Sequence, residues 1–147
     1  MEENKEYTKD LSLLGQGKAT RYPTNPDEAK LETFDNSFPN EPYKVTFKSD
    51  EFTALCPITG QPDFATITIE YVPDRKCIES KSLKLYLFSY RSTGEFHEHV
   101  TNRILRDLVA VCSPLAMKVT GDFNVRGGIG IKAVAAYGNM AKALKKD

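Results

Sequence analysis

The stretch EFTALCPITGQPDFATITIEY, residues 51–71, decides the fold of this chain. In its second half apolar residues alternate with polar ones, which is typical of a β-strand that buries one face. Residues 57–62, PITGQP, are turn-forming and predict that the chain reverses direction there. Residues 43–49, YKVTFKS, alternate in the same way. We therefore expect two antiparallel strands, joined through Cys56 and the turn that follows it.

Two helices are predicted after these strands. Within residues 80–91 the spacing i, i+3, i+4, i+7 favours a helix, although a period of two also fits, and Ser80 is a candidate N-cap. The helical set is Leu83, Tyr86, Leu87 and Tyr90. The second helix has a clear apolar stripe and ends before Pro114. Its stripe consists of Phe96, Val100, Ile104, Leu108 and Val111.

Two more strands are expected at residues 115–125 and 127–134, around the turn Arg126-Gly127-Gly128. The resulting order ββααββ predicts one α+β domain over residues 41–147, with an antiparallel sheet covered by two helices on one face. Residues 1–40 are predicted to form an irregular arm, and the basic tail to fray. Two helices leave both edges of such a sheet open, so we expect the chain to self-associate into a homo-oligomer.

Composition and charge exclude several classes of protein. The chain of 147 residues has 20 Lys plus Arg and 20 Asp plus Glu, so no net field favours a direct nucleic-acid or membrane partner. The charged N-terminus does not resemble a secretory or transit signal, which predicts a cytoplasmic protein. Three cysteines without a CxxC pair argue against a disulfide framework and a zinc ribbon.

Cys56 has two interpretations from the residues alone: a small buried hydrophobe or a reactive thiol. Cys112 is expected in the core, and Cys77 in a loop without an assigned role. His97 and His99 diverge on either a helix or a strand, so we expect no catalytic metal.

The segments LCPITGQPDFATITIEYVPD, residues 55–74, and ESKSLKLYLFSYRSTGEFHE, residues 79–98, resemble a known enzyme family. They are similar to the NADPH-dependent nitrile reductases of queuosine biosynthesis, the 7-cyano-7-deazaguanine reductases. The resemblance extends from Tyr43 to the strand RGGIGI. It implies the tunnelling fold, in which ββααββ subunits join their sheets into an oligomeric barrel. For this short, single-module type it implies paired pentamers with active sites between subunits, and a helix at residues 80–91.

The resemblance also implies roles for the residues of the two segments. Cys56 matches the nucleophile that adds to the nitrile carbon and forms a thioimide, which accepts hydride more readily than the nitrile. Asp63 matches the proton donor, because each hydride on carbon requires a proton on nitrogen. The implied substrate-binding residues are Ile78, Glu79, Ser80, His97 and Glu98.

Within that set, an ionised carboxylate such as Glu98 can accept the two parallel N–H donors of the deazaguanine edge. His97 either delivers a proton or holds the substrate. NADPH is the implied cofactor, with Lys81, Lys84 and Arg126 as its cationic contacts. No GxGxxG motif is present, so a Rossmann cradle is not expected. Two alternatives stay open: a metal-dependent pterin or GTP cyclohydrolase of the same fold, and a non-catalytic purine-binding ring protein.

Overall fold

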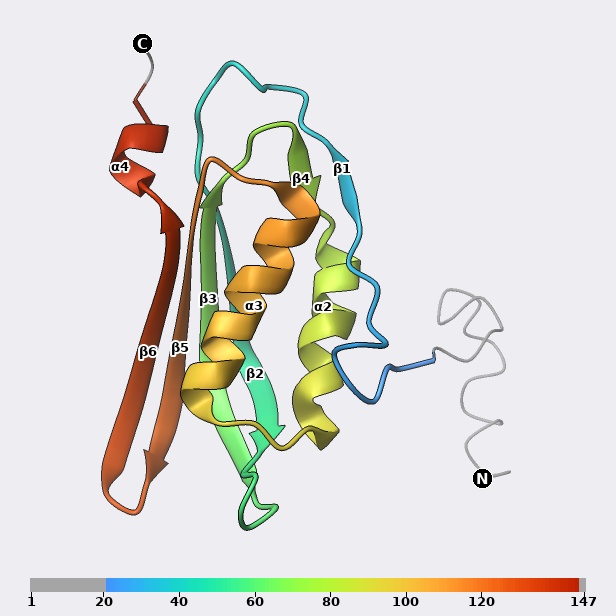
Figure 1. The fold of residues 1–147 in the computed structure, drawn as a ribbon, viewed down its shortest axis with the longest axis vertical. Coiled ribbons are helices and arrows are strands. Elements are labelled where there is room, and N and C mark those ends of the chain that lie inside the picture. Colours follow the sequence, from blue (N-terminus) through green and yellow to red (C-terminus); the bar gives the residue numbers. More distant parts are fainter. Residues whose placement is uncertain (1–20, 146–147) are drawn as a thin grey trace, which may run out of the picture.

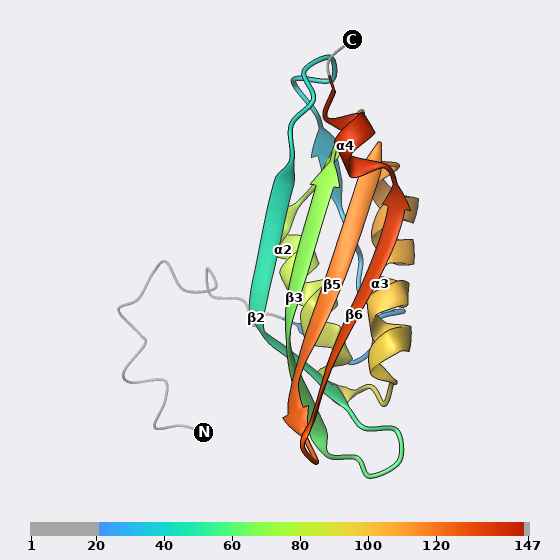
Figure 2. The same ribbon diagram turned by 90° about the vertical axis from the view of Figure 1, so that its left-hand side faces the viewer.

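The computed structural model describes residues 21–145, which form one antiparallel sheet with two helices packed on one of its faces (Figures 1 and 2). The strand order of the sheet is β2-β3-β5-β6. Its strands are β2 Val45–Leu55, β3 Pro62–Val72, β5 Ala116–Arg126 and β6 Ile129–Gly138. The helices are α2 Ser80–Phe88 and α3 His97–Cys112. The predicted ββααββ order and the single covered face are therefore confirmed.

Smaller elements differ from the sequence expectations. Strand β1, Thr33–Asp35, pairs with β4, Lys76–Ile78, so part of the predicted irregular arm is a strand. Cys77 consequently lies buried in β4 and not in a loop. A 3-10 turn, η2 Ser89–Ser92, follows α2, and a short helix α4, Met140–Ala143, occupies part of the tail that was expected to fray. The expectations for residues 1–20 and 146–147 lie outside the described residues.

Strand β2 is longer than predicted. It continues past Ser49 to Leu55, and its pairing with β3 shifts register between Ser49 and Phe52. Asp50 and Glu51 are consecutive exposed polar residues, which interrupt the alternation in the sequence. The irregularity absorbs the interruption as a β-bulge does, so that Phe52 and Ala54 again face the core.

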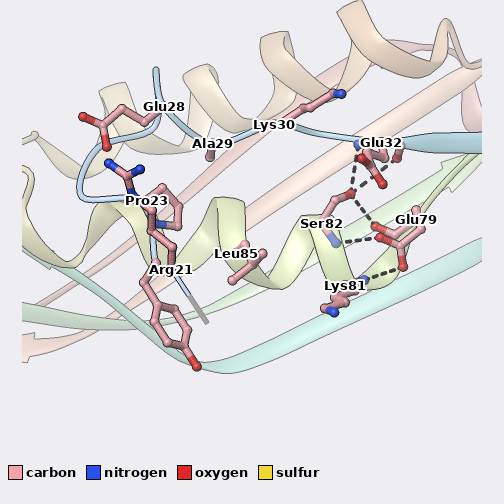
Figure 3. Close-up of a pocket in the computed structure, with 11 residues that line it drawn as sticks. Arg21, Pro23, Glu28, Ala29, Lys30, Glu32, Glu79, Lys81, Ser82 and Leu85 are labelled. Carbon is pink, nitrogen blue, oxygen red and sulfur yellow. Dashed lines mark hydrogen bonds between the residues drawn. The ribbon is translucent and has the colours of Figure 1, made fainter. Parts of the chain in front are cut away.

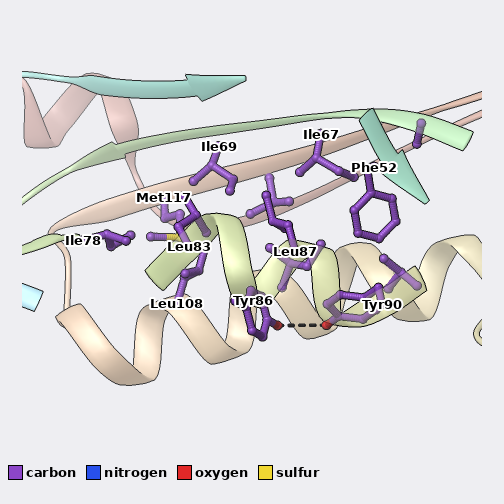
Figure 4. Packing of buried hydrophobic residues seen from close by; sticks show 14 of the residues in the cluster. Phe52, Ile67, Ile69, Ile78, Leu83, Tyr86, Leu87, Tyr90, Leu108 and Met117 are labelled. Atoms are coloured by element: carbon purple, nitrogen blue, oxygen red, sulfur yellow. Dashed lines mark hydrogen bonds between the residues drawn. The ribbon is translucent and has the colours of Figure 1, made fainter. Parts of the chain in front are cut away.

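The core lies between the inner face of the sheet and the two helices (Figure 4). The helical spacing predicted for α2 is confirmed, because Leu83, Tyr86, Leu87 and Tyr90 are all buried. In α3 the buried stripe is Val100, Ile104 and Leu108, and Cys112 continues it. Phe96, which we placed on this stripe, is instead 59% exposed, because it precedes the helix as its N-cap residue.

The N-terminus of α2 is capped by Glu79 and not by Ser80. The Glu79 carboxylate accepts hydrogen bonds from the backbone N–H groups of Lys81 at 2.8 Å and Ser82 at 2.7 Å. Ser80 is already the first helical residue. An acceptor one residue before the helix satisfies N–H groups that the helix itself leaves open. These bonds lower the pKa of Glu79 and stabilise its charged form.

A short parallel bridge ties the start of α3 to the end of β2. The Leu55 N–H donates to the carbonyl oxygen of Thr93 at 3.0 Å, and the Glu95 N–H donates to the carbonyl oxygen of Leu55 at 3.1 Å. Gly94 lies close against Pro57, since an added Cβ would be 3.3 Å from the Pro57 Cα. The bridge brings His97, the first residue of α3, to the end of the sheet that holds Cys56.

Candidate active site

Asp63 is a buried carboxylate at the end of the inward-facing row of β3. It is only 7% exposed and shares its face of the strand with Ala65 and Ile67. A carboxylate removed from water needs charged or hydrogen-bonding partners. Arg126 Nη1 donates to Asp63 Oδ1 at 2.5 Å, and His97 Nε2 lies 3.2 Å from Asp63 Oδ2. Strands β3 and β5 and helix α3 thus bring together three of the predicted site residues.

Arg126 also reaches the loop that follows Cys56. Its Nη2 atom donates to Thr59 Oγ1 at 3.0 Å and to Gln61 Oε1 at 2.9 Å. The family resemblance implied a cofactor contact for Arg126 and no role for Thr59 or Gln61. Both lie in the turn segment PITGQP, but nothing in that pattern shows which cation they face.

The His97 ring stacks on Phe123, with ring centroids 4.0 Å apart and an interplanar angle of 10°. The Thr101 hydroxyl donates to the His97 carbonyl oxygen at 2.9 Å. Gly121 leaves room for both neighbours, because a Cβ there would lie 2.6 Å from Thr101 Oγ1 and 2.9 Å from Phe123 Cε2. Phe123 was missed by the sequence analysis; alternation predicts that it is buried, but not which ring it meets.

Cys56 is partly exposed and its backbone is held in a tight turn. Its N–H donates to the Gln61 carbonyl oxygen at 2.8 Å, and its carbonyl oxygen accepts from the Gly60 N–H at 2.9 Å. Gly60 has φ +71°, a conformation that favours glycine. Hydrogen bonding by the Thr59 side chain, then by the backbone amides of Thr59 and Ile58, lowers the pKa of the thiol from 9.0 to about 7, with the Arg126 charge assisting.

These features favour the reactive thiol over the buried hydrophobe for Cys56. Cys112 of the same chain provides a comparison for Cys56. Cys112 is 1% exposed, and burial raises its pKa to about 12. Partial exposure and a lowered pKa are the properties of a nucleophilic cysteine.

We predict that iodoacetamide modifies Cys56 with a pH midpoint of about 7. The thiolate is the reacting form, so the rate rises with pH through the pKa of the folded protein and is lost below it. Mass spectrometry of tryptic peptides measures the rate at each pH. Thr59→Val should move the midpoint upward, whereas Thr53→Val, a matched change on β2, should not. A midpoint near the ordinary cysteine value of roughly 8.5 would contradict the prediction.

All but one of the other predicted residues lie just before α2 or in its first half, where Figure 3 shows Glu79 and Lys81. Ile78 is buried, and its N–H donates to the Tyr71 hydroxyl at 2.9 Å. The Glu79 carboxylate is occupied as the helix cap. Ser80, Lys81 and Lys84 are exposed.

Two cavities adjoin α2, each of about 670 Å³. One lies between the segment 21–32 and the start of the helix and includes Lys81 in its wall (Figure 3). The other lies between β2 and α2 and is lined by both Lys81 and Lys84, with Lys48, Arg91, Phe47 and Phe88 among its further residues. Neither wall includes Cys56 or Asp63.

The predicted site residues therefore form two groups, one from β4 through the first half of α2 and the other at the end of the sheet that holds Cys56. The helix begins after β4, beyond the Val72 end of β3, and runs back toward the end that holds Cys56 (Figure 1). Its nine residues span roughly 13 Å at about 1.5 Å per residue. Glu98 belongs to the Cys56 end, where it is exposed in the first turn of α3. One chain does not bring the two groups together.

Comparison with known proteins identifies the family. A family model described as QueF-like protein matches residues 62–142, more than half of the chain. The chain belongs to the QueF-like family. The match includes Asp63, His97 and Arg126, and also the segment at the start of α2.

Three curated relatives of this QueF-like chain are named NADPH-dependent 7-cyano-7-deazaguanine reductase. The protein of Neisseria meningitidis serogroup C is 54% identical over 138 residues, 94% of this chain and 87% of that protein. The Streptococcus mutans protein is 53% identical over 135 residues, 92% of this chain and 83% of that one. The Bacillus cytotoxicus protein is 50% identical over 141 residues, 96% and 85% of the two chains.

A solved structure supports the fold of the QueF-like chain. The crystal structure of the archaeosine synthase QueF-Like in the apo form matches with a TM-score of 0.59. It covers 67% of this chain and 95% of that chain at 23% sequence identity, so the likeness concerns the fold alone. The fold is the tunnelling fold that the sequence resemblance implied.

The two histidines of the QueF-like chain have separate partners. His97 faces Asp63, whereas His99 Nδ1 lies 2.9 Å from Glu95 Oε2. Within residues 21–145 no group of three or more His, Cys, Asp and Glu side chains gathers around a common point. None of the helices in this part of the chain is long and apolar enough to span a bilayer.

Proposed function

We propose that the protein reduces the nitrile of 7-cyano-7-deazaguanine to the primary amine 7-aminomethyl-7-deazaguanine, with NADPH as reductant, as a step of queuosine biosynthesis. The names of relatives that are 50–54% identical support the reaction. The single observation that carries the mechanism is the activated Cys56 thiol at the sheet end where Asp63, His97 and Arg126 meet.

In the proposed mechanism the Cys56 thiolate attacks the nitrile carbon and forms a C–S bond. The nitrogen takes up one proton, and a thioimide results. Asp63 and His97 lie 3.2 Å apart through Oδ2 and Nε2, so a proton can pass between them. Arg126 on the other oxygen keeps Asp63 oriented. This geometry supports proton delivery for His97, one of its two predicted roles.

NADPH would supply two hydrides, and the nitrogen takes up two protons in total, so that the nitrile becomes a CH₂–NH₂ group. Breaking of the C–S bond returns the thiolate. The residues that fit the cofactor are Lys81 and Lys84, exposed cations on the wall of the cavity between β2 and α2. Cations suit its phosphates, and the aromatic rings of Phe47 and Phe88 in the same wall suit its base.

Substrate recognition is assigned to Glu98. Its carboxylate is exposed next to His97 and can accept two parallel N–H donors. Glu79 is a weaker candidate within one chain, because both of its oxygens already accept from the backbone of α2. The roles of Ile78 and Ser80 stay predictions.

The complete site is proposed to form between subunits, in a barrel of paired pentamers. Two observations support an oligomer. The two groups of site residues lie apart within one chain, and the edge strand β6 exposes Ile129, Val134 and Tyr137. An open edge with exposed apolar residues favours pairing with another copy.

A mixing experiment tests the shared site. Cys56→Ala and the double variant Lys81→Ala, Lys84→Ala should each show little activity alone. Co-expression with two affinity tags gives mixed oligomers, in which random pairing leaves about one quarter of the sites with both groups intact. Nitrile-dependent activity should therefore recover in proportion to these intact sites. Mixed oligomers that stay inactive would contradict a site shared between subunits.

The function itself is tested by following NADPH absorbance with and without 7-cyano-7-deazaguanine. We expect NADPH to be oxidised only when the nitrile is present. Two NADPH molecules should be consumed for each amine formed, and mass spectrometry identifies the amine. Tight binding of the nitrile without oxidation would support a purine-binding ring protein instead. Activity on GTP that depends on stoichiometric zinc would support a cyclohydrolase.

A further inference from the structure

Arg126 lies at the end of β5, and its guanidinium donates to two residues of the connection between β2 and β3 and to one residue at the start of β3. These acceptors are Thr59 Oγ1, Gln61 Oε1 and Asp63 Oδ1, at 3.0, 2.9 and 2.5 Å. The side chain is 38% exposed, and that of Asp63 is 7% exposed. The arginine therefore joins the tip of the β5–β6 hairpin to the loop that carries the thiol.

Apart from Arg126, few contacts hold the outer part of this loop, residues 57–61. Residues 57–61 are all exposed, so apolar burial contributes little to their order. Two backbone hydrogen bonds fix the base of the loop at Cys56. The Arg126 fork supplies two side-chain bonds further out, at Thr59 and Gln61. A planar guanidinium can bind three acceptors at fixed angles, which an ammonium group cannot do in the same way.

Arg126 has a second effect, through its ion pair with the Asp63 carboxylate. The same guanidinium that holds the loop also pairs with the buried Asp63 carboxylate, so a positive charge stands beside both the carboxylate and the Cys56 loop. Asp63 in turn raises the pKa of Arg126 and keeps it cationic. The arginine thus acts on the nucleophile and on the carboxylate at once.

We propose that Arg126 is a positioning residue for Cys56: its guanidinium holds the 57–61 loop so that Thr59 faces the thiol. The resemblance implied a cofactor contact for this arginine, and the geometry points to a role that precedes cofactor binding. The inference rests on contacts within one chain and does not depend on the proposed function.

Iodoacetamide kinetics on the purified full chain, without NADPH or nitrile, test the proposal. Arg126→Met should raise the pH midpoint for modification of Cys56 by about one unit, with about fivefold slower modification at the wild-type midpoint. Arg126→Lys should restore only part of the shift, because the charge returns without the fork. Arg106→Met, at an exposed position on α3, is the matched control and should behave as wild type.

A second variant avoids the loss of the buried ion pair. Gln61→Leu removes one acceptor from Arg126 but keeps the backbone bonds of residue 61 and the pair with Asp63. It should raise the midpoint less than Arg126→Met and accelerate hydrogen exchange of the Gly60 amide. Unchanged midpoints in both Arg126→Met and Gln61→Leu would overturn the proposal. Full recovery in Arg126→Lys would also overturn it, because charge alone would then suffice. A failure of either kind leaves the NADPH assay with the nitrile, and hence the proposed function, unaffected.

Discussion

Cys56→Ala is expected to abolish nitrile-dependent oxidation of NADPH. Without the sulfur, hydride must add directly to a nitrile, and the covalent route that divides this step is lost. We expect a fall in kcat on the order of 10⁴-fold or more, as is typical when a nucleophile is removed. NADPH absorbance measures the rate. Intact-protein mass spectrometry should show an added mass of one substrate in the wild type and none in the variant.

Cys77→Ala is the matched control, because Cys77 is buried in β4 and distant in the fold from the sheet end with Cys56. It should keep both the adduct and the activity. If Cys56→Ala still oxidised NADPH at a substantial fraction of the wild-type rate, the thioimide mechanism would be wrong. The protein could then still be a nitrile reductase that uses another mechanism.

Asp63→Asn is expected to form the adduct but to lose reduction by roughly 10²- to 10⁴-fold, the usual contribution of a positioned acid or base. The amide keeps the shape of the carboxylate but cannot carry the proton. The change also removes the negative charge between Arg126 and His97, so we expect the free energy of unfolding to fall by about 1–3 kcal/mol. Single-turnover assays with NADPH, beside mass spectrometry of the adduct, separate addition from reduction.

Asp122→Asn, an exposed aspartate on β5, is the control for Asp63→Asn and should change neither step. Loss of the adduct itself in Asp63→Asn would mean that the carboxylate acts on the thiol rather than on the later proton transfers. Unfolding followed by circular dichroism distinguishes either result from a failure to fold.

Much of the fold could be predicted because its signals are local. The alternation in residues 64–72 is long and regular, and it places Asp63 on the buried face of β3. The stripe of α3 is equally plain, and Pro114 follows its end. By contrast β1 has three residues and exists through its pairing with β4, more than forty positions away, which no local pattern reveals.

The site residues divide in the same way, into those that the sequence could predict and those that depend on long-range contacts. The resemblance identified Cys56, Asp63 and His97, and the structure brings Asp63 and His97 together. The partners of Arg126 could not be predicted, because they lie more than sixty positions away in the chain and Arg126 stands where β5 departs from regular pairing with β6. The pairing of those strands shifts register between Phe123 and Arg126. Such irregularities determine which side chain reaches a loop, and the alternation of apolar and polar residues in the sequence does not reveal them.

The hydrogen bonds on both sides of Cys56 bear on the activation entropy of the first chemical step. The Leu55 peptide is bonded to Thr93 and Glu95, and the Cys56 peptide to Gln61 and Gly60. The backbone that carries the sulfur is thus already ordered by hydrogen bonds in the folded chain, so formation of the C–S bond should require little further ordering of the main chain. Rates of thiol addition should accordingly depend on temperature mainly through enthalpy, with the main chain at residues 55–61 superimposable before and after the reaction.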